Sequence, residues 1–129
     1  MVCMGPSVIH WITLEAMQTI VELPEFHKRA SSLLKEFEKA SIINYLALHP
    51  KSGDLMQGTG GIRKLRWSAQ GKGKSGGVRI VYFYHNDIVP LFLLTLFGKG
   101  EKANLSKAER NELARLTNLL LKHYGAPNG

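Results

Sequence analysis

Three strand-like segments follow one another in the second half of this chain, and their order restricts the folds open to it. Ile62–Trp67 and Val78–Tyr84 are rich in β-branched and aromatic residues, and Ile88–Phe97 is almost continuously apolar. A run of Gly, Ser and Lys, Ser68–Gly77, joins the first two segments, and Asn86–Asp87 offers a tight turn before the third. This pattern predicts three consecutive antiparallel strands, of which the first two form a hairpin with a long tip.

Before these strands, apolar residues recur at helical spacing. Met17–Leu23 is β-prone, and Pro24 after it suits the first turn of a helix. One apolar face then continues as far as His49–Pro50, either as two helices or as one broken helix. The residues of this face are Phe26, Ala30, Leu33, Leu34, Phe37, Ala40, Ile43 and Ala47. A strand and then helices therefore precede the three strands.

A final helix follows the strands. Ser106 and Glu109 have the spacing of a capping box, and a helix that starts there ends near Tyr124. The core stripe of this helix is Leu113, Leu116 and Leu120. The sequence therefore predicts an α+β fold: a twisted antiparallel β-sheet with N-terminal helices packed on one face and a C-terminal helix.

The length and composition suit a single domain. With 129 residues and 44% hydrophobic content, the chain can bury a core of its own, and we assign residues 17–124 to that domain. Met17 is a second plausible start, so we expect residues 1–16 to form an extension outside the core fold and residues 125–129 to form a tail. The single cysteine, Cys3, excludes an internal disulfide framework and fits a reducing cytosol.

Positive charge is concentrated around the predicted hairpin. The formal net charge is +7, and no acidic residue lies between Asp54 and Asp87. The cations of this stretch are Arg63, Lys64, Arg66, Lys72, Lys74 and Arg79. Such a concentration is typical of a surface that binds a polyanion. A solvated basic loop is the alternative, and the cations inside the strands disfavour it.

Alternation along the strands predicts which cations share a face. Lys64 and Arg66 point to one face and Arg63 to the other, because successive side chains of a strand alternate. If Arg79 joins the first pair on a helix-free side of the sheet, the three form a solvent-facing cationic bowl. Lys72 and Lys74 then reach over this bowl from the tip, and Lys99 closes its rim.

A cationic bowl suits RNA cleavage. The ribose 2′-OH already lies beside the scissile phosphate, so a protein need only position it, move one proton and stabilise the charge of the phosphorane. Arginine holds phosphate through two hydrogen bonds, and a lysine crowded by other cations can act as a base. A basic face without catalysis is the other interpretation of the same residues.

Other chemistries find little support in the sequence. The histidines show no metal-ligand spacing, and the glycine-rich run GKGKSGG lacks the spacing of a P-loop and lies between strands. We therefore predict neither a metal nor a cofactor. Ile88–Phe97 is the longest apolar run, and it contains a proline and is too short to span a membrane.

Met17 to about Ser106 resembles the RelE/ParE toxin superfamily, specifically its HigB-like RelE branch. Three elements carry the resemblance: G-T-G-G-x-R-K-x-R-W from Gly58, G-K-G-K-x-G-G-x-R from Gly71 and G-K-x-E from Gly98. The resemblance implies a toxin of a type II toxin–antitoxin module that acts in the ribosomal A site, on mRNA and beside rRNA, and cleaves translated mRNA without metal. It also implies a cytoplasmic protein and a neighbouring antitoxin, of the helix-turn-helix, HigA-like kind.

By motif, the catalytic set of the family falls on Lys64, Arg66, Arg79 and Lys99. Arg63, Lys72 and Lys74 are the cations that we expect to bind RNA or the ribosome.

The sequence departs from RelE proper in two places. An arginine just after the G-K motif is replaced by Gly100, and Ser106 stands roughly where the family has a tyrosine near the chain end. Glu101 can supply a carboxylate acid or base instead, or it can form a salt bridge at the end of a strand, so the group that moves the proton stays open. A ParE-like inhibitor of DNA gyrase and a plain RNA- or ribosome-binding domain are the alternative functions.

Overall fold

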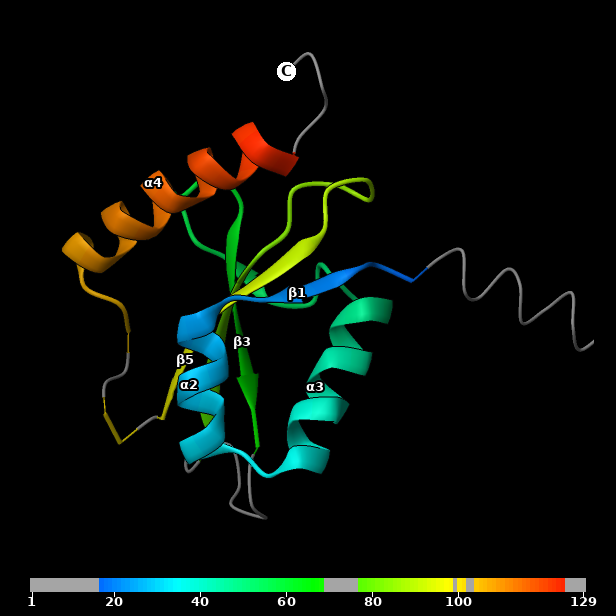
Figure 1. Ribbon diagram of the computed structural model, residues 1–129. Coiled ribbons are helices and arrows are strands. Elements are labelled where there is room, and N and C mark those ends of the chain that lie inside the picture. Colours follow the sequence, from blue (N-terminus) through cyan, green and yellow to red (C-terminus); the bar gives the residue numbers. More distant parts are fainter. Residues whose placement is uncertain (1–16, 69–76, 99, 102–103, 125–129) are drawn as a thin grey trace, which may run out of the picture.

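The computed structural model describes residues 17–68, 77–98, 100–101 and 104–124, which form one five-stranded sheet with helices on both faces (Figure 1). The elements are β1 (Ile20–Glu22), α2 (Pro24–Leu33), α3 (Glu36–Leu48), β2 (Asp54–Leu55), β3 (Ile62–Trp67), β4 (Val78–Phe83), β5 (Leu91–Gly98) and α4 (Lys107–Tyr124). The strand order is β1-β5-β4-β3-β2. The predicted α+β class, with N-terminal helices and a C-terminal helix, is confirmed.

Two apolar clusters fill the two faces of the sheet. Phe26 of α2 and Ile42 of α3 belong to one cluster, which includes Ile80 and Tyr82 of β4. The other cluster lies under α4 and includes Leu120, together with other side chains of β4 and β5. Figure 1 shows α2 and α3 beside each other and α4 apart from them. β4 is therefore buried along its whole length, and β5 along most of its length.

The sheet is mixed rather than antiparallel throughout. β3, β4 and β5 form the predicted antiparallel series, but β1 pairs with β5 in parallel, with Ile20 opposite Leu91. No local pattern predicts this pairing, because its two strands lie far apart along the chain. The two-residue strand β2 was also not predicted, since its residues follow a turn directly.

The third predicted strand begins later than expected. Ile88 is 86% exposed, and the strand starts at Leu91. The Asn86 side chain accepts hydrogen bonds from the backbone N–H groups of Ile88 and Val89, and this turn occupies the start of the predicted segment. The Tyr84 hydroxyl donates to Asp87, and this hydrogen bond raises the pKa of Tyr84 to about 12.

The N-terminal helical pattern forms two helices, and the core face of the second agrees only in part with the predicted face. The carboxylate of Glu38 accepts from the backbone N–H of Lys35, which caps the start of α3. Phe37, predicted in the core, is 67% exposed, whereas Ile42 and Leu46 are buried. The expected apolar face of α3 was wrong at Phe37 and Ala40, which are exposed, and confirmed at Ala47, which is buried, and at Ile43, which packs against the core.

The predicted C-terminal helix is confirmed with its cap. The backbone N–H of Glu109 donates to the Ser106 hydroxyl, and the Glu109 carboxylate accepts from the N–H of Ser106. Leu120 is buried, and Leu113 and Leu116 pack against the same cluster. No helix in the described ranges is long and apolar enough to cross a membrane.

One buried hydroxyl holds the turn between α3 and β2. Tyr82 donates to the carbonyl of Pro50 and accepts from the backbone N–H of Gly53, both at 2.8 Å. A Cβ at Gly53 would lie 2.9 Å from the Tyr82 ring, so only glycine lets the chain pass this close. Burial raises the pKa of Tyr82.

Tyr82→Phe should lower the free energy of unfolding by about 1–3 kcal/mol, because it leaves the Pro50 carbonyl and the Gly53 N–H without their partner. Urea denaturation measures this loss. Tyr124→Phe is the matched control: Tyr124 is 52% exposed, and its ring contact with Phe92 survives the substitution. Equal losses in the two variants would contradict the assignment of this hydroxyl to the turn.

Candidate nucleic-acid interface

The register of β3 and β4 brings three of the predicted cations to one face of the sheet. Arg66 lies directly opposite Arg79, and Lys64 lies two residues before Arg66. Leu65 and Trp67 pack on the face of α2 and α3, so the alternating residues Lys64 and Arg66 project to the other face. We call Lys64, Arg66 and Arg79 the cationic face, and the alternation predicted for it is confirmed.

This face is not free of helices, as the sequence had suggested. α4 packs over the part of the face that holds Ile62 and Phe83. The Thr117 hydroxyl of α4 reaches the carbonyl of Thr59, just before β3. The expected helix-free side was wrong because the leucine stripe of α4 needs an apolar surface, and Ile62 and Phe83 provide it.

Arg79 is buried rather than solvent-facing. Arg79 is only 7% exposed. Its Nη1 is buried and has no hydrogen-bond partner in the part of the chain that the structure describes. Like charges directly opposite each other in a sheet destabilise it, and an unpaired buried charge is costly. The pairing of Arg79 with Arg66 is therefore an arrangement that a bound anion would stabilise.

Lys64 lies between two hollows of the surface. One, of about 260 Å³, is lined by Lys64, Arg66 and Asp54 among others. The second, of about 450 Å³, is lined by Lys64, Asp54, Asn104 and Arg110 together with apolar side chains. The Lys64 ammonium donates to the Asn104 side chain, and Asp54 lies opposite Lys64 in the sheet. Polar groups of β2, β3 and the start of α4 thus converge on this lysine.

Sequence reasoning missed Asp54, Asn104 and Arg110. The capping box placed Arg110 in the first turns of a helix, but no local pattern shows where that helix packs. Asp54 follows a predicted turn, and its position beside Lys64 depends on the pairing of β2 with β3.

Two further candidate site residues, Arg63 and Glu101, bind other groups of the fold. The Arg63 guanidinium donates to the carbonyls of Lys51 and Gly53, on the face opposite to Arg66. The Glu101 carboxylate accepts from Arg29 of α2 and from the backbone N–H of Gly98. Of the two roles that the sequence allowed for Glu101, these contacts match the salt bridge at the end of a strand.

The remaining candidates, Lys72, Lys74 and Lys99, lie outside the described residues, as do residues 1–16 and 125–129. Within the described ranges, no group of three or more His, Cys, Asp or Glu side chains is placed to hold a metal ion.

A family model described as the RelE toxin of the RelE/RelB toxin–antitoxin system matches residues 26–126. The chain belongs to the RelE toxin family. The match runs from α2 through α4 and includes the whole cationic face. This membership gives the chain the role of a toxin and implies an antitoxin as its partner. Assignment of the toxin to the HigB-like branch stays a prediction.

Proposed function

We propose that this toxin is an endoribonuclease that cleaves translated mRNA on the ribosome, by attack of a ribose 2′-OH on the adjacent phosphate. The observation that carries the proposal is the buried guanidinium of Arg79, which has an unpartnered Nη1 and lies opposite Arg66. A phosphate between the two arginines would pair the buried charge and relieve their mutual repulsion. Arginine suits this role because its planar fork matches two phosphate oxygens.

The cationic face suits the transition state better than the ground state. When the 2′-oxygen attacks phosphorus and the bond to the 5′-oxygen breaks, negative charge grows on the non-bridging oxygens. Arg66 and Arg79 are already in place, so their attraction increases as this charge develops. Lys64 lies roughly 7 Å along β3, two residues from Arg66, where its ammonium can protonate the departing 5′-oxygen. The proton of the attacking 2′-OH passes to solvent water. The products are a 2′,3′-cyclic phosphate and a 5′-hydroxyl.

In this proposal the ribosome positions the mRNA substrate. The described part of the toxin offers a short row of cations on β3 and β4. A partner that presents the mRNA in a fixed path would supply the remaining orientation, which accounts for much of the acceleration in such reactions. The sequence motifs in β3 and around β4 that resemble the RelE/ParE superfamily support action on the ribosome.

An in vitro translation assay tests the proposal. Purified toxin should produce new 5′ ends at fixed codon positions, only on mRNA that is being translated, and the upstream fragments should carry a 2′,3′-cyclic phosphate. A matched mRNA with a 2′-deoxynucleotide on the 5′ side of the mapped bond should not be cleaved there, because the nucleophile is missing. The same deoxynucleotide one codon away is the control.

Two outcomes would contradict the proposal. Cleavage of the deoxy-substituted bond would exclude attack by the 2′-OH. Intact mRNA in cells that stop growing with an SOS response would favour the ParE-like alternative, inhibition of DNA gyrase.

A further inference from the structure

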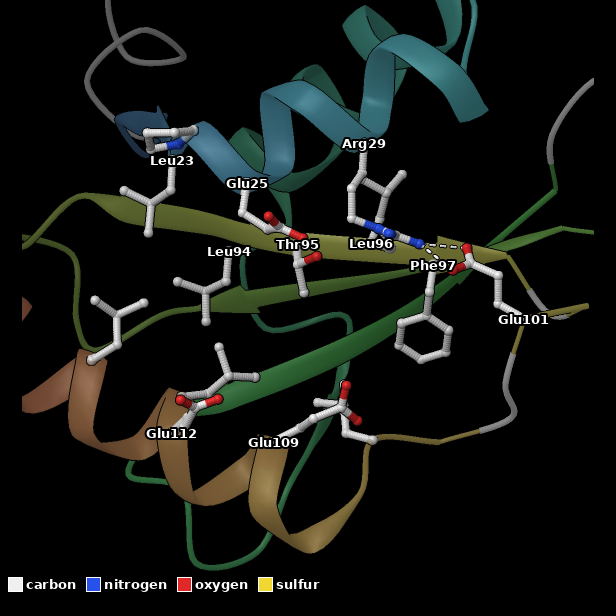
Figure 2. A pocket seen from close by; sticks show the side chains of 14 residues that line it. Leu23, Glu25, Arg29, Leu94, Thr95, Leu96, Phe97, Glu101, Glu109 and Glu112 are labelled. Atoms are coloured by element: carbon white, nitrogen blue, oxygen red, sulfur yellow. Dashed lines mark hydrogen bonds and ion pairs between the residues drawn. The ribbon is translucent and has the colours of Figure 1, made fainter.

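A groove of about 560 Å³ lies between α2, β5 and α4, and Phe97 on its floor pairs with Arg79 in the sheet (Figure 2). Its floor is apolar: Leu94 and Phe97 of β5 and Leu105 line it. Leucines of α4 form one wall, and the start of α2 forms the other. Figure 2 shows side chains from all three elements converging on this space. None of Lys64, Arg66 and Arg79 lines it.

The groove runs beside an edge of β5 that has no neighbouring strand in the described chain. β1 pairs with β5 only at Leu91–Leu93. Farther along, Arg29 donates to the carbonyl of Leu96, and Glu101 binds both Arg29 and the backbone of Gly98. These contacts cap the edge in the way that proteins protect exposed strands. An occupant would therefore insert side chains here rather than add a strand.

The rim of the groove has the opposite charge to the protein as a whole. Glu25, Glu101, Glu109 and Glu112 line it together with Arg29, whereas the chain has a formal net charge of +7. The carboxylates come from α2, from the segment after β5 and from α4, so they surround the apolar floor. We call this site the acidic groove.

We propose that the acidic groove binds an amphipathic polypeptide segment of a partner protein, with aliphatic side chains on the floor and Lys or Arg side chains at the rim. Charge complementarity selects this occupant, because opposite potentials across an interface favour the matching partner and exclude like charge. RNA is excluded for the same reason. Amphipathic segments in apolar grooves are a common mode of peptide recognition. The proposal does not depend on RNA cleavage, since none of the cationic-face residues lines the groove, although Leu105 borders both the groove and the larger hollow beside Lys64.

A pair of synthetic peptides tests this inference on the full chain. Both have the same leucine pattern at helical spacing, and their polar positions are lysine in one and glutamate in the other. In ¹⁵N NMR titrations, the lysine peptide should shift the amide signals of Leu94, Leu113 and Leu116, and the glutamate peptide should leave these signals in place.

Matched variants test the role of charge. Glu112→Lys should weaken binding of the lysine peptide about tenfold, a change of about 1.4 kcal/mol. Glu36→Lys makes the same charge change on α3, at an exposed residue outside the groove, and should alter affinity less than twofold. Circular dichroism confirms that both variants fold.

Three outcomes of the titrations would overturn the proposal. The lysine peptide fails to bind at millimolar concentration, the two peptides bind equally well, or the shifted signals centre on Arg66 and Arg79. Concentration-dependent shifts of the groove signals without peptide would identify a second copy of this chain as the occupant. Shifts of the groove signals with an RNA oligonucleotide would show that charge does not select the occupant.

Discussion

Arg79→Met should lower the rate of mRNA cleavage about 10²–10³-fold and leave the toxin at least as stable as before. Removal of one preorganised charge that acts on the transition state typically costs about 10²–10³-fold in rate. Methionine keeps an apolar stem in the buried site but removes the unpartnered Nη1 and the repulsion from Arg66. Relief of a like-charge pair across a sheet is worth roughly 0.2–1 kcal/mol. Activity and stability should therefore change in opposite directions.

Single-turnover cleavage on programmed ribosomes and thermal unfolding measure the two effects. Arg115→Met is the matched control, because Arg115 is exposed on α4 and lines none of the hollows around Lys64. Arg79→Lys retains the charge without the planar fork and should recover part of the rate. A loss of several kcal/mol in Arg79→Met, with activity falling only as far as the folded fraction, would show that Arg79 is structural.

Phe26→Ala should lower the free energy of unfolding by about 3–5 kcal/mol, the usual cost of removing a large aromatic side chain from a core. Phe26 is 0% exposed and lies in the cluster that joins α2 to the sheet. Phe37→Ala, on the next helix, should change it by no more than about 0.5 kcal/mol, because that side chain is largely exposed. Urea denaturation of both variants measures the difference.

The comparison of the two phenylalanines decides how α3 packs. Equal losses would mean that Phe37 faces the core, as the continuous apolar pattern had suggested. The slope of the denaturation curve should stay the same in both variants, since neither changes the surface that unfolding exposes by much.

Sequence patterns predicted the fold where the physical signal is local. Alternation along Ile62–Trp67 gave the two faces of β3, and the Ser106–Glu109 spacing gave the start of α4, because each depends only on neighbours in the chain. The apolar face of α3 could be predicted only in part in this way: Ala47 is buried as expected, but Phe37 is exposed. The break at Lys35 starts a new helix, and its rotation is set by the sheet beneath it rather than by the preceding turn.

The cationic face could be predicted only in part, because it too depends on contacts between segments that are distant in the sequence. The sequence placed Arg66 and Arg79 on adjacent strands, but a long connection such as Ser68–Gly77 does not fix the register that puts them opposite each other. Burial of Arg79 depends on packing against other strands. The acidic groove has no sequence pattern at all, because its carboxylates come from three separate segments.

The parallel pairing of β1 with β5 also determines when the sheet can be completed during folding. The Gln18 side chain donates to the carbonyl of Val89, 71 residues later in the sequence, and β1 lies against β5 just beyond this contact. Contacts of such separation close slowly, whereas β3, β4 and β5 follow one another along the chain and are separated by far fewer residues. During synthesis β1 has no partner in this sheet until β5 has been translated. A nascent toxin therefore cannot complete the sheet before β5 has been made.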